Sequence, residues 1–386
     1  MGKTSKYVTA AALCSTIVMG GLQASSVSYA ATNPTTVTTQ SDAKLLNDFR
    51  KELKKQIDNR EENITIAYKT KDRDARKIMD QLYGEFNKMV DADEYVKYNV
   101  ASTRYSIKGM PGNYTFTLQV EYRESKEQTQ YVKSQAKAIV NSIIKQGMDE
   151  HEKVKAIHDY VVKYVSYDTS YQAYTAYEAL ANRSAVCQGY TLLTYQLLQE
   201  AGIQNHIVTG TGNGQAHAWN LVNIDNRWYH LDTTFDDPVP DKAGRVTYSY
   251  FNMSDEQLSK DHEWDRSEYP AATTSYFNEL TSKIKAGSSK TAVYEQMLKE
   301  TNLKYLSAQY GAENYNEFKK KLQQQFASRP EKVEVRYKQS MDGTMQDIKK
   351  VLDEIAWPKG AKRVSYQVAP YSAMAGYSLA TITFTY

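Results

Sequence analysis

Residues 185–202 read AVCQGYTLLTYQLLQEAG. From Tyr190 onward the apolar residues recur at helical spacing, and Gly202 follows them as a C-terminal capping residue. Cys187 is therefore predicted at or just before the first turn of a helix. The backbone N–H groups and the positive dipole end at such a place favour a thiolate over a thiol. They can also stabilise an oxyanion on an attacked carbonyl group.

The two cysteines of the chain, Cys14 and Cys187, are predicted to have different fates. Residues 1–30 combine a positive start, an apolar run over residues 7–22 and a small-x-small site ending at Ala30, the pattern of a cleaved secretory signal peptide. A membrane anchor is the alternative, but the apolar run is short. Cys187 would then be the only cysteine of the mature chain, so reactivity explains it more easily than cross-linking. A small buried apolar side chain is the structural alternative.

Residues 217–237 read HAWNLVNIDNRWYHLDTTFDD, and they predict a β-hairpin. Apolar and polar residues alternate over 218–224 and 227–233, and the Asp-Asn pair between them suits a two-residue turn because both residues tolerate positive φ. In that register His217 is the diagonal neighbour of Asp232 on one face, with roughly 7–8 Å between the backbones. An imidazole can reach a carboxylate across this gap. A loop of odd length would put the two side chains on opposite faces.

Cys187, His217 and Asp232 together provide the groups that a thiol nucleophile needs. His217 would take the proton from the thiol, and Asp232 would fix the imidazole tautomer and stabilise the imidazolium. Taken alone, His217 can also be interpreted as a core histidine with satisfied hydrogen bonds, and Asp232 as a carboxylate at a strand end. The predicted register favours the joint interpretation.

The other histidines and acidic residues predict neither a metal nor a cofactor. His151 and His158 are seven residues apart on a predicted helix, which is too far for a chelating pair at i and i+4. Asp236, Asp237 and Asp241 offer oxygen atoms that calcium can bind, but their spacing matches no cation-binding loop. The expectation for these three residues is a solvated turn.

The composition is that of a soluble globular protein with two or three domains, because the chain has 386 residues, of which 41% are hydrophobic and 24% charged. Loss of the leader removes two lysines and leaves basic and acidic residues almost equal in number. This balance argues against nucleic acid as a partner. Beyond the leader no apolar segment is long enough to span a bilayer, so we expect no membrane association after signal cleavage.

The segments before and after the centre have the same predicted order of elements. Residues 31–40 are polar and predict a flexible mature N-terminus. In residues 41–125 we expect a helix, a strand, a helix and two strands, and residues 276–386 repeat this order. Phe49 to Tyr68 and Phe318 to Tyr337 have equal spacing, which suggests a duplicated α/β module, although two ordinary α/β segments can coincide by chance. The expected helices cover 45–57, 74–90, 318–326 and 344–355, and the expected strands cover 64–68, 98–107, 114–122, 333–337, 363–368 and 377–386.

Residues 126–275 form the predicted catalytic domain, and four blocks within them resemble a known family. The blocks are residues 174–180, 185–190, 217–220 and 228–236. In this order they resemble the transglutaminase-like core domain of secreted bacterial proteins. The resemblance implies a papain-like α+β fold with a catalytic triad of Cys187, His217 and Asp232. The predicted fold class is therefore α+β, with a central papain-like or transglutaminase-like cysteine-enzyme domain flanked by two similar small α/β modules.

The residues and the resemblance together predict an exported thiol acyltransferase, with hydrolase activity as an option. Cys187 would form a thioester from a glutamine carboxamide or a peptide carbonyl group and pass the acyl group to an amine or to water. The substrate would be a protein or peptide, with cell-wall peptides among the candidates, and the protein would be secreted or associated with the cell wall. The alternatives are a cysteine peptidase or amidase and a non-catalytic surface or binding protein. No cofactor is expected, and the oligomeric state stays open.

Overall fold

The computed structural model describes residues 42–240, 242, 244–371 and 373–386. The predicted leader and the predicted flexible segment lie outside the described residues, as does Asp241. The described chain divides into two compact units. The first unit extends to Val246 and also includes Leu258–Ala271, and the second comprises Thr247–Gln257 and Ala272–Tyr386.

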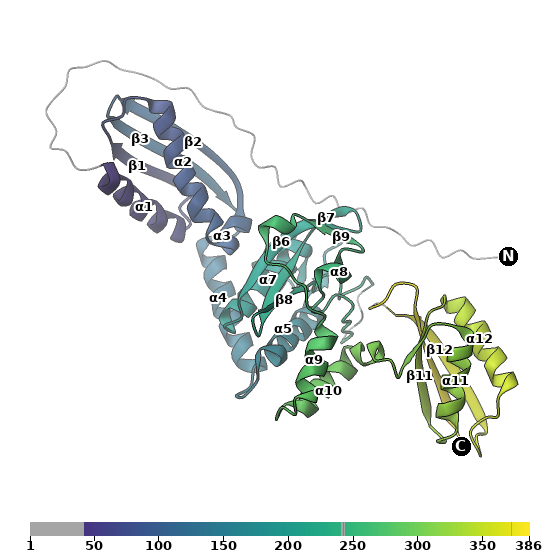
Figure 1. The fold of residues 1–386 in the computed structure, drawn as a ribbon. Helices are drawn as coiled ribbons and strands as arrows, with labels where there is room; N and C mark the ends of the chain where they lie inside the picture. The colour runs from purple at the N-terminus through teal and green to yellow at the C-terminus, as the bar shows by residue number, and fades with distance from the viewer. Residues whose placement is uncertain (1–41, 241, 243, 372) are drawn as a thin grey trace. The chain divides into compact units, whose positions relative to one another are not determined.

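The first unit begins with a small α/β module whose antiparallel sheet has the strand order β1-β3-β2 (Figure 1). Buried side chains from two helices, including Phe49 and Leu82, pack with sheet residues such as Phe116 into one core. The helices and strands that the sequence predicts for this segment are confirmed, and a short helix, α3, is added. The elements are α1 (Asp42–Asp58), β1 (Asn63–Lys69), α2 (Ala75–Asp91), α3 (Glu94–Asn99), β2 (Val100–Met110) and β3 (Asn113–Tyr122).

The rest of the first unit is built around helix α7 (Cys187–Glu200) and a four-stranded antiparallel sheet in the order β8-β7-β6-β9. Helix α7 buries residues on all of its sides, among them Tyr190, Leu193 and Leu197, so it is the central helix of this unit. The surrounding elements are α4 (Lys126–Ile143), α5 (Glu150–Tyr164), β4 (Ser166–Tyr167), α6 (Ala176–Ala181), β5 (Ser184–Ala185), β6 (Asn205–Gly212), β7 (Gln215–Ile224), β8 (Arg227–Leu231), β9 (His262–Trp264) and η1 (Arg266–Glu268).

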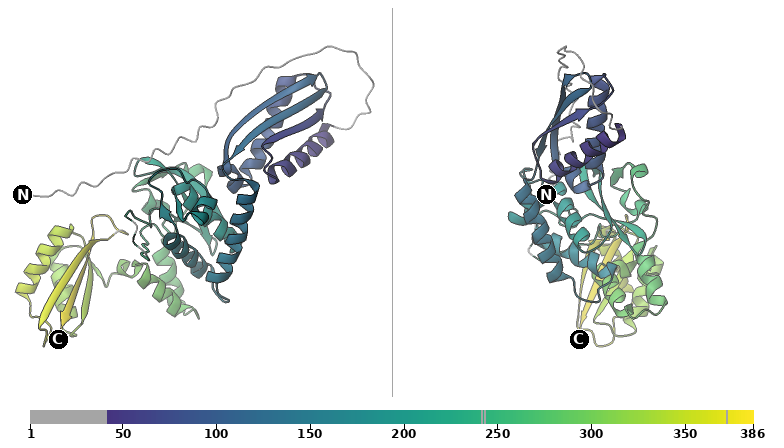
Figure 2. Two further views of the ribbon diagram at one scale, coloured as in Figure 1. Left: turned by 180° about the vertical axis from the view of Figure 1, so that it is seen from behind. Right: turned by 90° about the vertical axis from the view of Figure 1, so that its left-hand side faces the viewer.

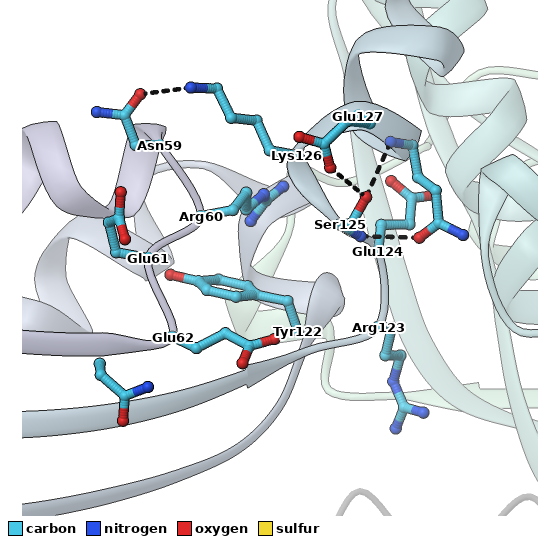
Figure 3. Close-up of a pocket in the computed structure, with 12 residues that line it drawn as sticks. Asn59, Arg60, Glu61, Glu62, Tyr122, Arg123, Glu124, Ser125, Lys126 and Glu127 are labelled. Atoms are coloured by element: carbon cyan, nitrogen blue, oxygen red, sulfur yellow. Dashed lines mark hydrogen bonds between the residues drawn. The ribbon is translucent and has the colours of Figure 1, made fainter.

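Glu124 joins the small module to the central part of the first unit. Its buried carboxylate accepts hydrogen bonds from the Tyr95 hydroxyl at 2.7 Å and from the Tyr177 backbone N–H at 3.0 Å. Beside it, a polar hollow of about 690 Å³ lies between the α1–β1 turn and the segment that connects β3 to α4 (Figure 3). Arg60 and Lys126 help to line this hollow, and none of the residues that the sequence predicts for catalysis does so.

The second unit ends in a four-stranded sheet with the order β10-β11-β13-β12. Its C-terminal strands and helices are coloured yellow in Figure 2. Its last three strands follow the order seen in the N-terminal module, with β11, β13 and β12 in the places of β1, β3 and β2. The helices and strands predicted for residues 318–386 are confirmed. Among the described residues, no helix combines the length and the apolar character needed to cross a membrane. The elements are α8 (Asp255–Leu258), α9 (Tyr276–Lys285), α10 (Thr291–Glu300), η2 (Leu303–Leu306), β10 (Gly311–Ala312), α11 (Tyr315–Phe326), β11 (Lys332–Tyr337), α12 (Met341–Glu354), β12 (Arg363–Pro370) and β13 (Ser378–Thr385).

Candidate active site

Cys187 is the first residue of α7 and is buried, with 4% of its surface exposed. The first turn of the helix is held close to the preceding segment because Gly189 has no side chain. A Cβ atom at Gly189 would lie 2.6 Å from the Cβ of Ala185 and 2.9 Å from the carbonyl oxygen of Thr175. Thr175 is the N-cap of α6. The glycine therefore lets α6 and the first turn of α7 approach each other closely, which fixes the position of the cysteine.

Two hydrogen bonds attach the same end of α7 to strand β7. The Thr191 hydroxyl donates to the carbonyl oxygen of Ala218 at 2.9 Å, and the side-chain amide of Asn220 donates to the carbonyl oxygen of Thr191 at 3.2 Å. Cys187 lies one helical turn before Thr191, and His217 directly precedes Ala218. The turn that carries the sulfur therefore lies beside the part of β7 that carries the imidazole.

The hairpin between β7 and β8 has the predicted turn and register. Ile224 pairs with Arg227, and the two turn residues have φ values of 50° and 60°, the left-handed conformation that a type I′ turn requires. The same register brings His217 and Asp232 to one face of the sheet. Nε2 of His217 lies 2.7 Å from Oδ2 of Asp232, and both side chains are buried.

Asp232 is held as a carboxylate by four hydrogen bonds. Its Oδ1 atom accepts from the backbone N–H groups of Thr234 at 3.0 Å and Phe235 at 3.1 Å, and its Oδ2 atom meets His217 and a second histidine. Burial alone would raise the pKa of Asp232, but the charge of His217 and the hydrogen bonds from both histidines outweigh it and hold the pKa well below its usual range. An ionised carboxylate only accepts, so Nε2 of His217 is the donor and Nδ1 is the nitrogen left to take a proton.

The second histidine on Asp232 is His262, which the sequence does not single out. Its Nε2 atom lies 3.2 Å from Oδ2 of Asp232, and its Nδ1 atom lies 2.6 Å from Oδ1 of Asp261. Burial lowers the pKa of His262, but the hydrogen bonds and charges of the two carboxylates more than compensate and raise it above its ordinary value. His262 begins β9, a strand of three residues, which is too short to show an alternating pattern. Only its place as the last histidine of the chain is visible in the sequence.

The expectation that Asp236 and Asp237 lie in a solvated turn is wrong. Both residues are buried: Asp236 lies 3.0 Å from Nε2 of His158, and Asp237 accepts a hydrogen bond of 2.6 Å from the Tyr190 hydroxyl. The physical reason is that this turn runs back against α5 and α7, which supply the partners for both carboxylates. These two aspartates therefore anchor the segment that follows Asp232.

The nearby side chains narrow the space around the imidazole. The ring of Phe235 lies 4.5 Å from the ring of His217, measured between centroids. Nδ1 of His230 accepts a hydrogen bond of 3.0 Å from the Trp219 indole, so His230 has a packing partner of its own.

One ligand-type atom from each of His217, Asp232 and His262 lies within 4.8 Å of the other two, close enough for a shared cation. Hydrogen bonds already join these atoms and account for their closeness.

The central part of the chain is similar to known proteins. Residues 137–233 match the model of the transglutaminase-like superfamily. Among curated proteins, kyphoscoliosis peptidase of Mus musculus is 25% identical over 166 residues, which are 38% of this chain and 25% of that protein. The chain therefore spans about a quarter of the length of this relative.

Two solved structures are similar to part of this chain at low sequence identity. A proposed cysteine protease from Cytophaga hutchinsonii is 16% identical with a TM-score of 0.25, covering 32% of this chain and 53% of that one. A structure described as a TGase is 17% identical with a TM-score of 0.24, covering 47% of this chain and 53% of that one.

Proposed function

We propose that the transglutaminase-like core domain of this chain, which the match over residues 137–233 identifies, is a thiol acyl-transfer enzyme. Cys187 is the nucleophile, His217 the base and acid, and Asp232 the group that orients the imidazole. One observation carries the proposal. His217 lies 2.7 Å from the buried, ionised Asp232, and the next residue of β7, Ala218, accepts a hydrogen bond from the helix that begins with Cys187.

The reaction follows from the protonation states of these groups. Nδ1 of His217 takes the thiol proton, and the sulfur of Cys187 attacks the carbonyl carbon of a glutamine side chain or peptide bond. The helix N-terminus stabilises the negative oxygen of the tetrahedral intermediate. The carbon–nitrogen bond then breaks, the imidazolium gives its proton to the departing amine or ammonia, and a thioester remains. An amine or water attacks this thioester, loses a proton to His217 and releases the acyl group, and the sulfur leaves as thiolate.

A second candidate is hydrolysis by a cysteine peptidase or amidase. It uses the same first half-reaction and differs only in having water as the acceptor. The curated relative carries the name of a peptidase, which favours this candidate, although the matched part is a quarter of that protein. A binding protein that keeps the fold without the reaction is the third candidate, and it requires no reactive thiol.

One incubation separates these candidates. The chain without its first 30 residues is mixed with a peptide that contains glutamine and with a fluorescent primary amine, and the products are measured by mass spectrometry. Amine transfer gives a fluorescent adduct, hydrolysis gives a deamidated or cleaved peptide, and a non-catalytic protein gives neither. Cys187→Ser is the control and should abolish every product. Products that persist in this variant would contradict the role of Cys187.

Because the sequence predicts a secretory leader, we also propose that this enzyme acts outside the cytoplasm on proteins or peptides, including cell-wall peptides. Expression with the leader in a secreting host should place the protein in the culture medium, with a mass that fits cleavage after Ala30. Retention of the full-length chain inside the cells would contradict export.

A further inference from the structure

His262 contacts Asp232 but takes part in no step of the proposed reaction. Its side chain is fully buried and lies between two carboxylates, Asp232 on one side and Asp261 on the other. Each ring nitrogen is within hydrogen-bonding distance of a carboxylate oxygen, at 3.2 Å and 2.6 Å. A carboxylate accepts and does not donate when ionised, so both ring nitrogens must carry protons. His262 is then an imidazolium.

The strand pairing explains how this cation comes so close to His217. Strand β9 pairs with β6, and β6 pairs with β7, so His262 and His217 come from two strands on either side of β6. Gly212 of β6 leaves room between them, because a Cβ atom there would lie 3.1 Å from the ring of His217 and 3.2 Å from Nε2 of His262. The centroids of the two rings are 5.5 Å apart.

We propose that His262 is a positioning residue that, as a buried imidazolium, holds Asp232 in place and limits how tightly His217 binds a proton. This inference rests on the proposed function and adds a second histidine to its site. Asp232 carries one negative charge, and two imidazole rings share it. When His217 takes the thiol proton, it becomes positively charged. Asp232 attracts this charge, and His262 repels it. The imidazolium is therefore less stable than beside a carboxylate alone, and it gives its proton to the leaving group more readily.

Among the described residues, the elements around this pair carry further titratable groups. Asp261 precedes β9 and is 30% exposed, and Cys187 begins α7. His230 lies on β8 next to the Trp219 indole, whose N–H it accepts, so its Nδ1 atom is unprotonated. Asp232 and His262 therefore provide the charges that most directly oppose each other at His217.

The test measures protonation directly, so that it does not depend on turnover. Imidazole nitrogen NMR shifts of the full mature chain are followed against pH in a Cys187→Ala background, which removes the coupling to the thiol. We expect both nitrogens of His262 to be protonated at neutral pH. We also expect His262→Gln to raise the titration midpoint of His217 by about one to two pH units, given a separation near 5.5 Å and an effective dielectric constant of roughly 20 to 40.

Two further variants separate charge from structure. Asp261→Asn removes a partly exposed carboxylate and keeps His262 in place, and it should also raise the midpoint of His217 because His262 loses its charge more easily. His206→Gln is the control: His206 also lies on β6 but contacts Glu94 and not Asp232, and its replacement should leave that midpoint unchanged. If His262→Gln does not fold, the Asp261→Asn titration decides the question.

The activity profile gives a second readout. In His262→Gln with the cysteine present, the acidic limb of the kcat/KM profile should move to higher pH, because His217 must lose its proton before it can take the thiol proton. A neutral His262 at pH 7, or an unchanged His217 midpoint in both variants, would overturn the proposal. Absence of any acyl transfer would instead contradict the proposed function. The NMR titration would still test the role of His262, because it does not depend on activity.

Discussion

Asp232 is the residue on which the candidate site depends most directly. Both of its oxygen atoms are used: backbone N–H groups from Thr234 and Phe235 fix Oδ1, and two histidines meet at Oδ2. Because the backbone bonds come from the residues just after it, the carboxylate cannot turn away from His217 without unfolding its own turn. This local rigidity holds the imidazole in one orientation, which a base that must meet a sulfur atom requires.

A histidine outside the site, His158, makes a pH-dependent contribution to stability. Its buried ring lies 3.1 Å from Asp159 and 3.0 Å from Asp236. Burial lowers the pKa of His158, but the two carboxylates raise it above its ordinary value, which is near 6.5. A group whose pKa is raised in the folded state stabilises the fold below its unfolded pKa, and this contribution is lost as the pH rises through the folded pKa.

We therefore expect the free energy of unfolding of His158→Gln to fall furthest below the wild type at pH values under about 6.5. The difference should shrink as the pH increases, as measured by urea denaturation at a series of pH values. His206→Gln is the control, because His206 contacts Glu94 near the surface and should give a smaller effect. A difference that stays constant across the range would show that folding does not change the pKa of His158, and one that grows as the pH increases would show that the folded protein holds His158 neutral.

Local spacing in the sequence predicted the hairpin that carries the candidate site but not the short strand β9 or the helices α9 and α10. The hairpin register follows from a two-residue turn with residues that tolerate positive φ, and it was enough to bring His217 and Asp232 together. Strand β9 has only three residues, so no period marks it, and His262 was missed with it. The burial of Asp236 and Asp237 depends on partners from α5 and α7 that are distant in sequence, which local spacing does not reveal.

The close approach of α6 and α7 gives a prediction for Gly189→Ala. The new Cβ atom would lie 2.6 Å from the Cβ of Ala185 and 2.9 Å from the carbonyl oxygen of Thr175, and neither atom belongs to a flexible side chain. We expect a loss of about 1–3 kcal/mol in the free energy of unfolding, because overpacked sites force the backbone to shift. The alkylation rate of Cys187 should change as well, because the same turn positions its sulfur.

Gly84→Ala is the matched control for this substitution. Gly84 lies inside α2 and has nothing within 4 Å of the position that a Cβ atom would take. Alanine there should stabilise the protein by about 0.5–1 kcal/mol, since glycine is unfavourable inside a helix. Equal effects at the two glycines would contradict the packing described for the start of α7.

At the scale of the whole molecule, the chain combines a central transglutaminase-like domain with α/β modules in both compact units. The module in the second unit has its own core, in which Phe318 of α11 packs with Val335 of β11 and Ile382 of β13. The equal strand orders of the two modules are consistent with duplication, which the sequence suggested from equal spacing. The predicted catalytic residues lie in neither module.

The C-terminal core gives a prediction about truncation. Removal of residues 331–386 takes away β11, α12, β12 and β13 and leaves Phe318 and Leu322 of α11 without the surface that buries them. We expect this protein to be insoluble or aggregated in size-exclusion chromatography, because an exposed apolar helix face promotes association. Removal of residues 308–386 takes away the whole module and should give a more soluble protein. A monodisperse product of the shorter deletion would contradict a shared core.

The pairing of Cys187 with His217 can be tested by measuring the rate at which iodoacetamide alkylates Cys187 as a function of pH. We expect rapid alkylation well below the ordinary cysteine pKa of about 8.5, slowed strongly in His217→Ala and unchanged in His206→Ala. A thiol that stays inert at every pH in the folded protein, or one that reacts equally with and without His217, would contradict it.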